Sequence, residues 1–104
     1  MDTLARLEQT IKARLAASPE ESYVARLGAG GAKVIGKKVA EEAAELVIEG
    51  VAGDEVDVTG EAADLLFHTM VLLAHRGVSL ATVLAELERR EGTSGLVEKA
   101  SRGT

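Results

Sequence analysis

Apolar residues recur at helical spacing from the start of the chain. The first four lie three or four positions apart: Leu4, Leu7, Ile11 and Leu15. This spacing predicts an amphipathic helix over about residues 2–17. The segment Ser18-Pro19-Glu20 then indicates a stop followed by a new start, with the proline in the first turn of the next helix. We expect that helix to be short and to run through Tyr23 to Leu27.

Glycines divide the middle of the chain. The segment Gly28-Ala-Gly-Gly31 predicts a break, and the pattern beyond it predicts a third helix over about residues 32–49. Residues 50–60 contain Gly53-Asp54, which is typical of a turn, so we interpret this stretch as a connecting loop.

The second half of the chain continues as helix. Thr59 is a candidate cap for a fourth helix that lasts to about Arg76, and Gly77 is suited to end it. Ser79 is expected to cap a fifth helix, and the tail after Gly92 has room for one more helical turn. We find no alternating segment typical of a strand. The sequence predicts an all-α protein of about four to five helices, in a single domain over residues 1–104 whose core spans about residues 2–90, with a tail at 91–104.

The fourth predicted helix carries apolar residues on every side. They are Ala62, Ala63, Leu65, Leu66, Phe67, Met70, Val71, Leu72 and Leu73. A helix that is apolar all round is a buried helix. A chain of 104 residues is too small to surround such a helix easily, so we expect a homodimer to complete the bundle.

Composition excludes several classes of protein. The chain has no cysteine, which excludes disulfides and thiolate chemistry. No apolar run approaches the roughly 18 residues of a membrane span, and the N-terminal residues do not resemble a secretion signal. We therefore expect a cytoplasmic protein with no membrane partner. A net charge of −5 and only two aromatic residues also argue against nucleic acid as a partner.

Acidic residues are concentrated in one segment. Residues 39–75 contain no lysine or arginine and nine acids, which leaves twelve bases and eight acids in the rest of the chain. The nine are Glu41, Glu42, Glu45, Glu49, Asp54, Glu55, Asp57, Glu61 and Asp64. Solvated helix faces usually mix the two signs, because opposite charges four residues apart stabilise a helix and like charges destabilise it. The segment is either a repelling surface or a set of carboxylates held by a bound cation.

Two acid–x–x–acid pairs stand out within this segment. Glu42 pairs with Glu45 on the third predicted helix, and Glu61 pairs with Asp64 on the fourth. Residues three apart share a helix face, and the Ala-Ala spacers leave room for a neighbouring helix or a ligand. If the two helices form an antiparallel hairpin, the four carboxylates converge.

Converging carboxylates call for a cation or for protons. Two like charges about 4 Å apart repel by roughly 4 kcal/mol at an effective dielectric constant of 20. Ligands that are all oxygen favour Mg²⁺, Mn²⁺ or Ca²⁺ over Zn²⁺, and Mg²⁺ held in this way usually also binds phosphates. The pattern thus indicates phosphoanhydride hydrolysis at a metal site. The alternative is a solvated acidic face, which is the usual role of a single such pair.

Several other polar residues have two interpretations. Lys37 and Lys38 either pair with acids one turn later or bind substrate phosphates; the nearby glycines resemble a phosphate-binding loop, but Lys38 stands where that loop needs Ser or Thr. His68 is either a substrate contact or a histidine of the core or surface. Lys99 and Arg102 either bind phosphate or belong to a frayed terminus.

The sequence resembles the phosphoribosyl-ATP pyrophosphohydrolase family, within the all-α (MazG-type) nucleotide pyrophosphohydrolases. The segments that carry the resemblance are Ser22–Leu27, Lys37–Glu45, Glu61–His68 and Gly92–Arg102. The carboxylate motif is shared by the whole superfamily, whereas the tyrosine segment and the tail are specific to this family. Phe67 and Ala40 depart from the residues often found there, Tyr and Gly.

The resemblance implies a MazG-like helical bundle, a cytoplasmic homodimer whose chains together build the site, and a Mg²⁺ requirement, with Mn²⁺ as a substitute. It implies conversion of phosphoribosyl-ATP and water to phosphoribosyl-AMP and diphosphate in histidine biosynthesis. We expect the metal ligands to be Glu42, Glu45, Glu61 and Asp64. The water's proton would go to Glu41 or to a ligand carboxylate, Glu42 or Glu45.

The candidate substrate contacts are Lys37, Lys38, His68, Lys99 and Arg102. Two alternatives remain at this point: a house-cleaning pyrophosphohydrolase for another nucleoside triphosphate, and a non-catalytic helical dimerisation module with an acidic face.

Overall fold

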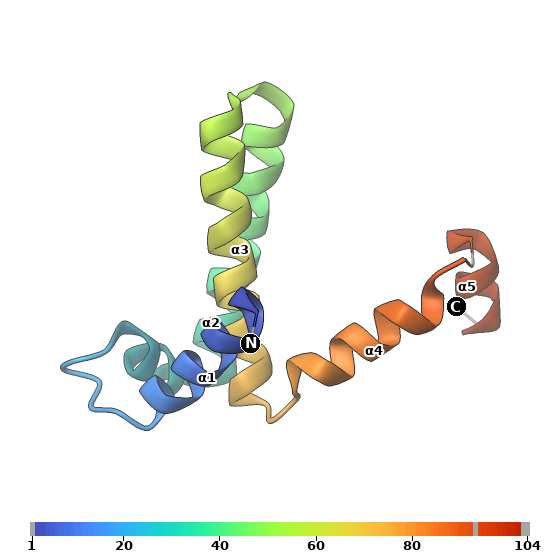
Figure 1. Ribbon diagram of the computed structural model, residues 1–104. Coiled ribbons are helices and arrows are strands. Elements are labelled where there is room, and N and C mark those ends of the chain that lie inside the picture. The colour runs from blue at the N-terminus through green and yellow to red at the C-terminus, as the bar shows by residue number, and fades with distance from the viewer. Residues whose placement is uncertain (1, 93, 103–104) are drawn as a thin grey trace.

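The computed structural model describes residues 2–92 and 94–102, which form five α-helices and, within those ranges, no strand. The helices are α1 (Thr3–Leu15), α2 (Tyr23–Ala52), α3 (Glu55–His75), α4 (Leu80–Arg90) and α5 (Gly95–Ser101). The predicted all-α class is therefore confirmed. Helices α2 and α3 form a long antiparallel hairpin, α1 lies across its lower end, and α4 and α5 form an arm that leads away (Figure 1).

The core lies at the lower end of the hairpin, where three helices meet. Its buried apolar residues are Ile11 of α1, Val24, Leu27 and Ile35 of α2, and Met70 and Val71 of α3. Burying a large apolar side chain contributes roughly 1.5–3 kcal/mol, so this cluster fixes α1 against the hairpin. Among the described residues, only α2 and α3 extend into the upper part of the hairpin (Figure 1).

Helix α2 is bent at Gly31. This residue has φ 83° and ψ −179°, a conformation that is open essentially to glycine alone. The predicted break is thus confirmed, but the helix before it extends to Gly30 and not only to Leu27. Gly28 stays helical and allows close packing, because a Cβ atom there would lie 2.8 Å from Cδ2 of Leu15.

Two predicted helix starts are wrong. Residues 50–60 are not a loop, because α2 runs to Ala52 and α3 already begins at Glu55. The cap is Asp54, whose carboxylate accepts a hydrogen bond from the backbone N–H of Asp57 at 2.9 Å, and Thr59 lies inside the helix. Upstream, Pro19 lies in a turn, and Ser22 caps α2 instead.

The predicted end of α3 and start of α4 are confirmed. Gly77 has φ 73° and follows the last turn of α3, and the Ser79 hydroxyl accepts a hydrogen bond from the backbone N–H of Thr82 at 3.2 Å. The carboxylate of Glu8 accepts a hydrogen bond from the backbone N–H of Leu80 at 2.7 Å, which ties the base of the arm to α1. The tail forms the seven-residue α5, longer than the single turn expected.

Within this chain helix α3 is covered most completely over residues 67–74, all of which are buried or half-buried. His68, Met70 and Val71 are buried, whereas Leu66 is 54% exposed. Among the described residues no single helix combines the length and the apolarity needed to cross a membrane, although α3 and α4, taken as a pair bent by 113°, pass the same test on length and composition.

Candidate active site

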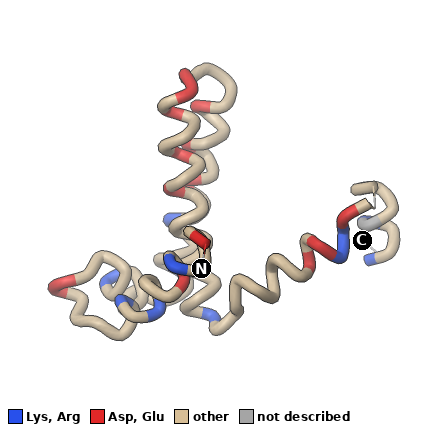
Figure 2. Tube along the Cα trace, in the orientation of Figure 1, with Lys and Arg blue, Asp and Glu red and all other residues tan. Residues whose placement is uncertain are grey.

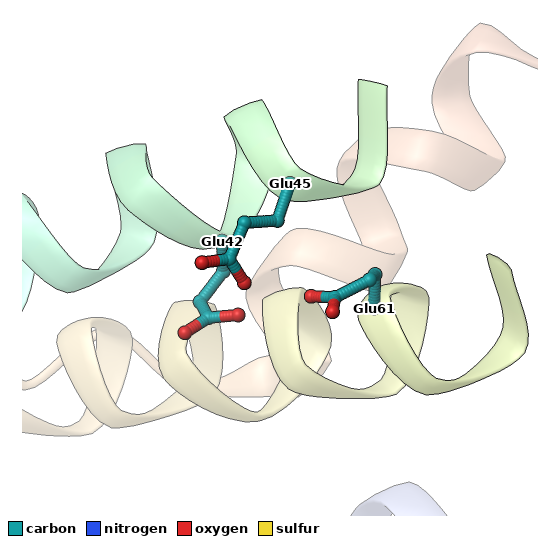
Figure 3. Close-up of side chains that lie close together, drawn as sticks. All are labelled: Glu42, Glu45 and Glu61. Carbon is teal, nitrogen blue, oxygen red and sulfur yellow. The ribbon is translucent and has the colours of Figure 1, made fainter. Parts of the chain in front are cut away.

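The α2–α3 hairpin brings three of the predicted acids together. Glu42 and Glu45 project from α2 toward Glu61 on α3 (Figure 3). Each offers a carboxylate oxygen, and these oxygens all lie within 4.8 Å of one another. We call these three residues the carboxylate cluster. Two expectations from the sequence account for this convergence. Residues three apart share a helix face, and the two helices form an antiparallel hairpin.

The carboxylate cluster contains buried oxygens that lack a partner. Glu42 is only 6% exposed, and Glu61 is half-buried. Within the described part of the chain, Oε2 of Glu42 and Oε2 of Glu61 are both buried without a hydrogen bond. A buried polar atom without a partner is costly, and a buried charge is costlier still. An all-oxygen donor set with unsatisfied lone pairs fits a hard divalent cation such as Mg²⁺.

The electrostatics of Glu61 lead to the same conclusion. Burial raises its pKa, and a hydrogen bond with Glu45 and the charges of Glu45, Glu42 and Asp64 raise it further, to about 7. This carboxyl group therefore keeps a proton at pH values where an unperturbed glutamate is already ionised. A divalent cation would replace that proton, because it relieves the same repulsion.

Asp64 and Glu41 lie outside the carboxylate cluster. The side chain of Asp64 is exposed and does not join the group of oxygens within 4.8 Å, although its charge contributes to the raised pKa of Glu61. Glu41 is also exposed, and its carboxylate lies 3.6 Å from Nζ of Lys38.

The predicted cationic contacts occupy different parts of the molecule. Nζ of Lys38 lies 3.4 Å from Oε1 of Glu42, so this lysine borders the carboxylate cluster. The hydrogen bond to Glu42 and the nearby Tyr23 raise the pKa of Lys38. Lys37 is exposed on the same helix. Figure 2 shows acids along both hairpin helices, with bases at the lower end of the hairpin and on the arm. Lys99 lies on α5 and Arg102 directly after it, and Figure 1 shows α5 at the end of the arm, away from the hairpin.

His68 is buried beside the site and has a partner at each ring nitrogen. Nδ1 lies 2.8 Å from the backbone oxygen of Asp64, and Nε2 lies 2.8 Å from the hydroxyl of Tyr23. A carbonyl oxygen only accepts, so Nδ1 donates; in the neutral ring Nε2 then accepts from the tyrosine. The ring also packs edge-on against Phe67, with centroids 5.1 Å apart. This is the environment of a core histidine, the alternative interpretation from the sequence.

Comparison with known proteins identifies the family. Residues 4–91 match the sequence profile described as phosphoribosyl-ATP pyrophosphohydrolase. The chain belongs to the phosphoribosyl-ATP pyrophosphohydrolase family. The predicted membership is thereby confirmed, and with it the prediction that the chain is an enzyme of the hydrolase class.

Several curated relatives match this family member over nearly their whole length. A phosphoribosyl-ATP pyrophosphatase of Rhizorhabdus wittichii is 65% identical over 96% of this chain and 94% of its own. One from Erythrobacter litoralis is 59% identical over 99% of both chains. One from Dinoroseobacter shibae is 57% identical over 98% of this chain and all of its own.

Sequence reasoning did not single out Tyr23 as a candidate residue of this family member's site. Tyr23 served only as part of the resemblance, yet its hydroxyl reaches His68 across 45 positions of sequence. Helix α2 bends at Gly31, and Tyr23 before this bend contacts Phe67 and His68 of α3. The available signal was that this is the chain's one tyrosine, placed beside a helix cap at Ser22.

Proposed function

We propose that this chain hydrolyses phosphoribosyl-ATP to phosphoribosyl-AMP and diphosphate, a step of histidine biosynthesis, and that it requires Mg²⁺, with Mn²⁺ as a substitute. The observation that carries the proposal is the carboxylate cluster, with its two unpartnered buried oxygens, in a member of this family. A cytoplasmic location and a homodimer belong to the same proposal.

The ligand set has three members from the carboxylate cluster and one beside it. Glu42, Glu45 and Glu61 would hold the ion, and Asp64 would complete the set from the next turn of α3. Bound there, Mg²⁺ supplies positive charge against the triphosphate and lowers the pKa of a coordinated water.

The chain's own groups handle the proton and the charge of the reaction. The oxygen of water forms a bond to phosphorus, the anhydride P–O bond breaks, and diphosphate leaves. The proton of the water passes to a carboxylate, for which Glu41, Glu42 and Glu45 are the candidates. Lys38 lies where it can stabilise negative charge on the phosphates, because its ammonium group already borders Glu42.

The remaining predicted substrate contacts lie in different parts of the chain, so each has its own place in the proposal. Lys37 would reach phosphate from the exposed face of α2, and His68 would act on substrate through its neighbours. Lys99 lies on α5 and Arg102 directly after it, and α5 lies at the end of the arm, away from the hairpin (Figure 1). They would contact phosphate in a dimer in which the arm of one chain reaches the hairpin of its partner.

Replacement of Glu45 tests the proposal. Residues that only orient a metal ligand cost about 10–100-fold in activity when they are lost. Glu45 is itself a proposed ligand, so Glu45→Gln should reduce diphosphate release from phosphoribosyl-ATP by about 100-fold or more. Glu49→Gln is the matched control, because Glu49 lies one turn further along α2 and outside the carboxylate cluster. Both variants should keep the wild-type helical circular dichroism.

The same assay separates the alternatives. Faster turnover of an ordinary or damaged nucleoside triphosphate than of phosphoribosyl-ATP would indicate a house-cleaning enzyme. A lack of diphosphate release from every substrate, together with no thermal shift on adding Mg²⁺, would indicate a non-catalytic dimerisation module. Activity that survives Glu45→Gln or exhaustive chelation would contradict the metal site itself.

A further inference from the structure

A cavity of about 470 Å³ lies where the end of α1 and the start of α2 meet α3. Its walls include Arg14 of α1, Ser22, Tyr23 and Val24 at the start of α2, and Phe67 of α3. Cavities of roughly 300–1,000 Å³ that combine apolar walls with a few polar groups typically hold small molecules. None of the proposed metal ligands lines this cavity.

The two aromatic residues of the chain both line this cavity. Tyr23 and Phe67 are its only aromatic residues, and their ring planes lie 17° apart with centroids separated by 6.4 Å. Flat aromatic rings bind the flat face of a nucleobase by stacking. In a chain with so few aromatic residues, the presence of both at one cavity suits a purine ligand.

The cavity is fixed in position relative to the carboxylate cluster. The hydroxyl of Tyr23 contacts His68, which in turn contacts the backbone oxygen of Asp64, each at 2.8 Å. Phe67 follows Glu61 by six residues on α3, which corresponds to about 9 Å along the helix axis. A nucleotide whose phosphates lie at the carboxylates would extend its ribose and base along α3 into this cavity.

The lining of the cavity includes a positive charge. Arg14 is exposed near the end of α1, and among the residues that the structure describes its guanidinium forms no ion pair. Guanidinium groups bind phosphate through paired hydrogen bonds. Glu21 also lines the cavity and offers an acceptor for sugar hydroxyls. The lining therefore suits a ligand with a purine ring, hydroxyls and a second phosphate.

We propose that this cavity binds the purine ring of the substrate, with Tyr23 and Phe67 against the base and Arg14 against the phosphate of the attached phosphoribosyl group. The inference rests on the proposed function, from which it takes the substrate. It assigns to these residues the recognition of the nucleoside, separate from the chemistry at the carboxylates.

Two variants and a control test this assignment by steady-state kinetics with phosphoribosyl-ATP and Mg²⁺. Phe67→Leu keeps an apolar side chain without the flat ring, and Arg14→Gln removes the charge. Each should raise KM about tenfold and leave kcat within about twofold, because binding that is equal in the ground and transition states changes KM alone. Lys12→Gln removes a charge from the same helix outside the cavity and should change neither constant.

Calorimetric titration with phosphoribosyl-AMP gives a second measure that needs no catalysis. Phosphoribosyl-AMP should bind about tenfold more weakly to both variants and with unchanged affinity to Lys12→Gln. Unchanged KM and unchanged affinity in both variants would overturn the inference while leaving the proposed function intact. A wild-type protein that releases no diphosphate would overturn the proposed function, and the titration would still decide the inference. If Phe67→Leu does not fold, Arg14→Gln at its exposed position decides alone.

Discussion

At the scale of single residues, Glu61 links the site to pH. Its carboxyl group is ordinary in chemistry but has a pKa of about 7 in the folded chain, against 4.5 for an unperturbed group, because burial and then Glu45, Glu42 and Asp64 disfavour its charge. Folded and unfolded chains therefore bind different numbers of protons between these two values. Such a difference makes the stability of the metal-free protein depend on pH in that window.

We expect the metal-free protein to lose stability as pH rises from about 4.5 to about 7. Over this range the unfolded chain has released the Glu61 proton and the folded chain still holds it, so each rise in pH favours unfolding. Glu61→Gln cannot ionise and should not show this loss. Its thermal midpoint in chelator should match the wild type most closely near pH 4.5 and exceed it increasingly toward pH 7.

The loss of stability at low pH has a different cause and can be told apart from the effect of Glu61. Hydrogen bonds from Arg89, together with its charge and that of Arg90, lower the pKa of Glu86 to about 2, so this group loses stabilisation as pH falls below about 4.5. The two windows do not overlap. If the thermal midpoints of wild type and Glu61→Gln change with pH in the same way between pH 4.5 and 7, the raised pKa of Glu61 is not present in solution.

Predictions about single residues succeeded where the residues concerned lie close together along the chain. Spacing places Glu42 and Glu45 on one face of a helix, and Glu61 meets them once two helices form a hairpin. The contact between Tyr23 and His68 could not be predicted from the sequence. It depends on the bend of α2 and on the packing of α1, and no local pattern encodes either. The direction of the Asp64 side chain depends on which side of α3 is solvated, so it could not be derived from spacing either.

At the scale of elements, the helices were predictable but several of their ends were not. Apolar periodicity depends on many residues, whereas a helix end depends on one or two hydrogen bonds. Both Asp54 and Thr59 are good capping residues. The acids Glu55 and Asp57 in the first turn favour the earlier start, because negative charge is stabilised at a helix N-terminus. Gly60, interpreted as loop, is tolerated inside the helix.

The bend in α2 depends on Gly31, and we expect Gly31→Ala to lower the free energy of unfolding by about 1–3 kcal/mol. The cause is backbone strain at φ 83°, since an added Cβ atom would meet nothing within 4 Å. Gly36→Ala is the matched control, because Gly36 lies in the same helix without a positive φ and has the same free space. It should raise stability by about 0.5–1 kcal/mol.

Thermal denaturation distinguishes these two alanine variants. In a domain of this size 1 kcal/mol corresponds to about 4–8 °C in Tm, so the two shifts should be easily resolved and opposite in sign. If Gly31→Ala raised Tm as Gly36→Ala does, the segment before the bend would not be held in this conformation, and the position of Tyr23 over α3 would lose its support.

At the scale of the whole molecule, the upper hairpin leaves apolar side chains in solvent. They are Val47 (64% exposed), Ile48 (63%), Val51 (84%) and Val56 (78%). Val47, Ile48 and Val51 lie within about one helical turn near the end of α2, and Val56 is the second residue of α3. Exposed apolar side chains gathered in one region often mark a contact with another chain. The homodimer expected from the sequence stays a prediction, and this face of the hairpin is a candidate place for the contact.

We therefore expect the protein to form a homodimer through this face of the hairpin, and Ile48→Glu to break it. Light scattering coupled to gel filtration should give about twice the 10.8 kDa chain mass for the wild type and the mass of one chain for the variant. A glutamate there would bury a charge without a partner in the dimer, which is far more costly than leaving it in solvent. Ala13→Glu, at an exposed position on α1, introduces the same charge outside this face and should stay dimeric. A wild type of single-chain mass, or an Ile48→Glu variant that remains a dimer, would mean that the exposed apolar face of the hairpin is not where two chains meet.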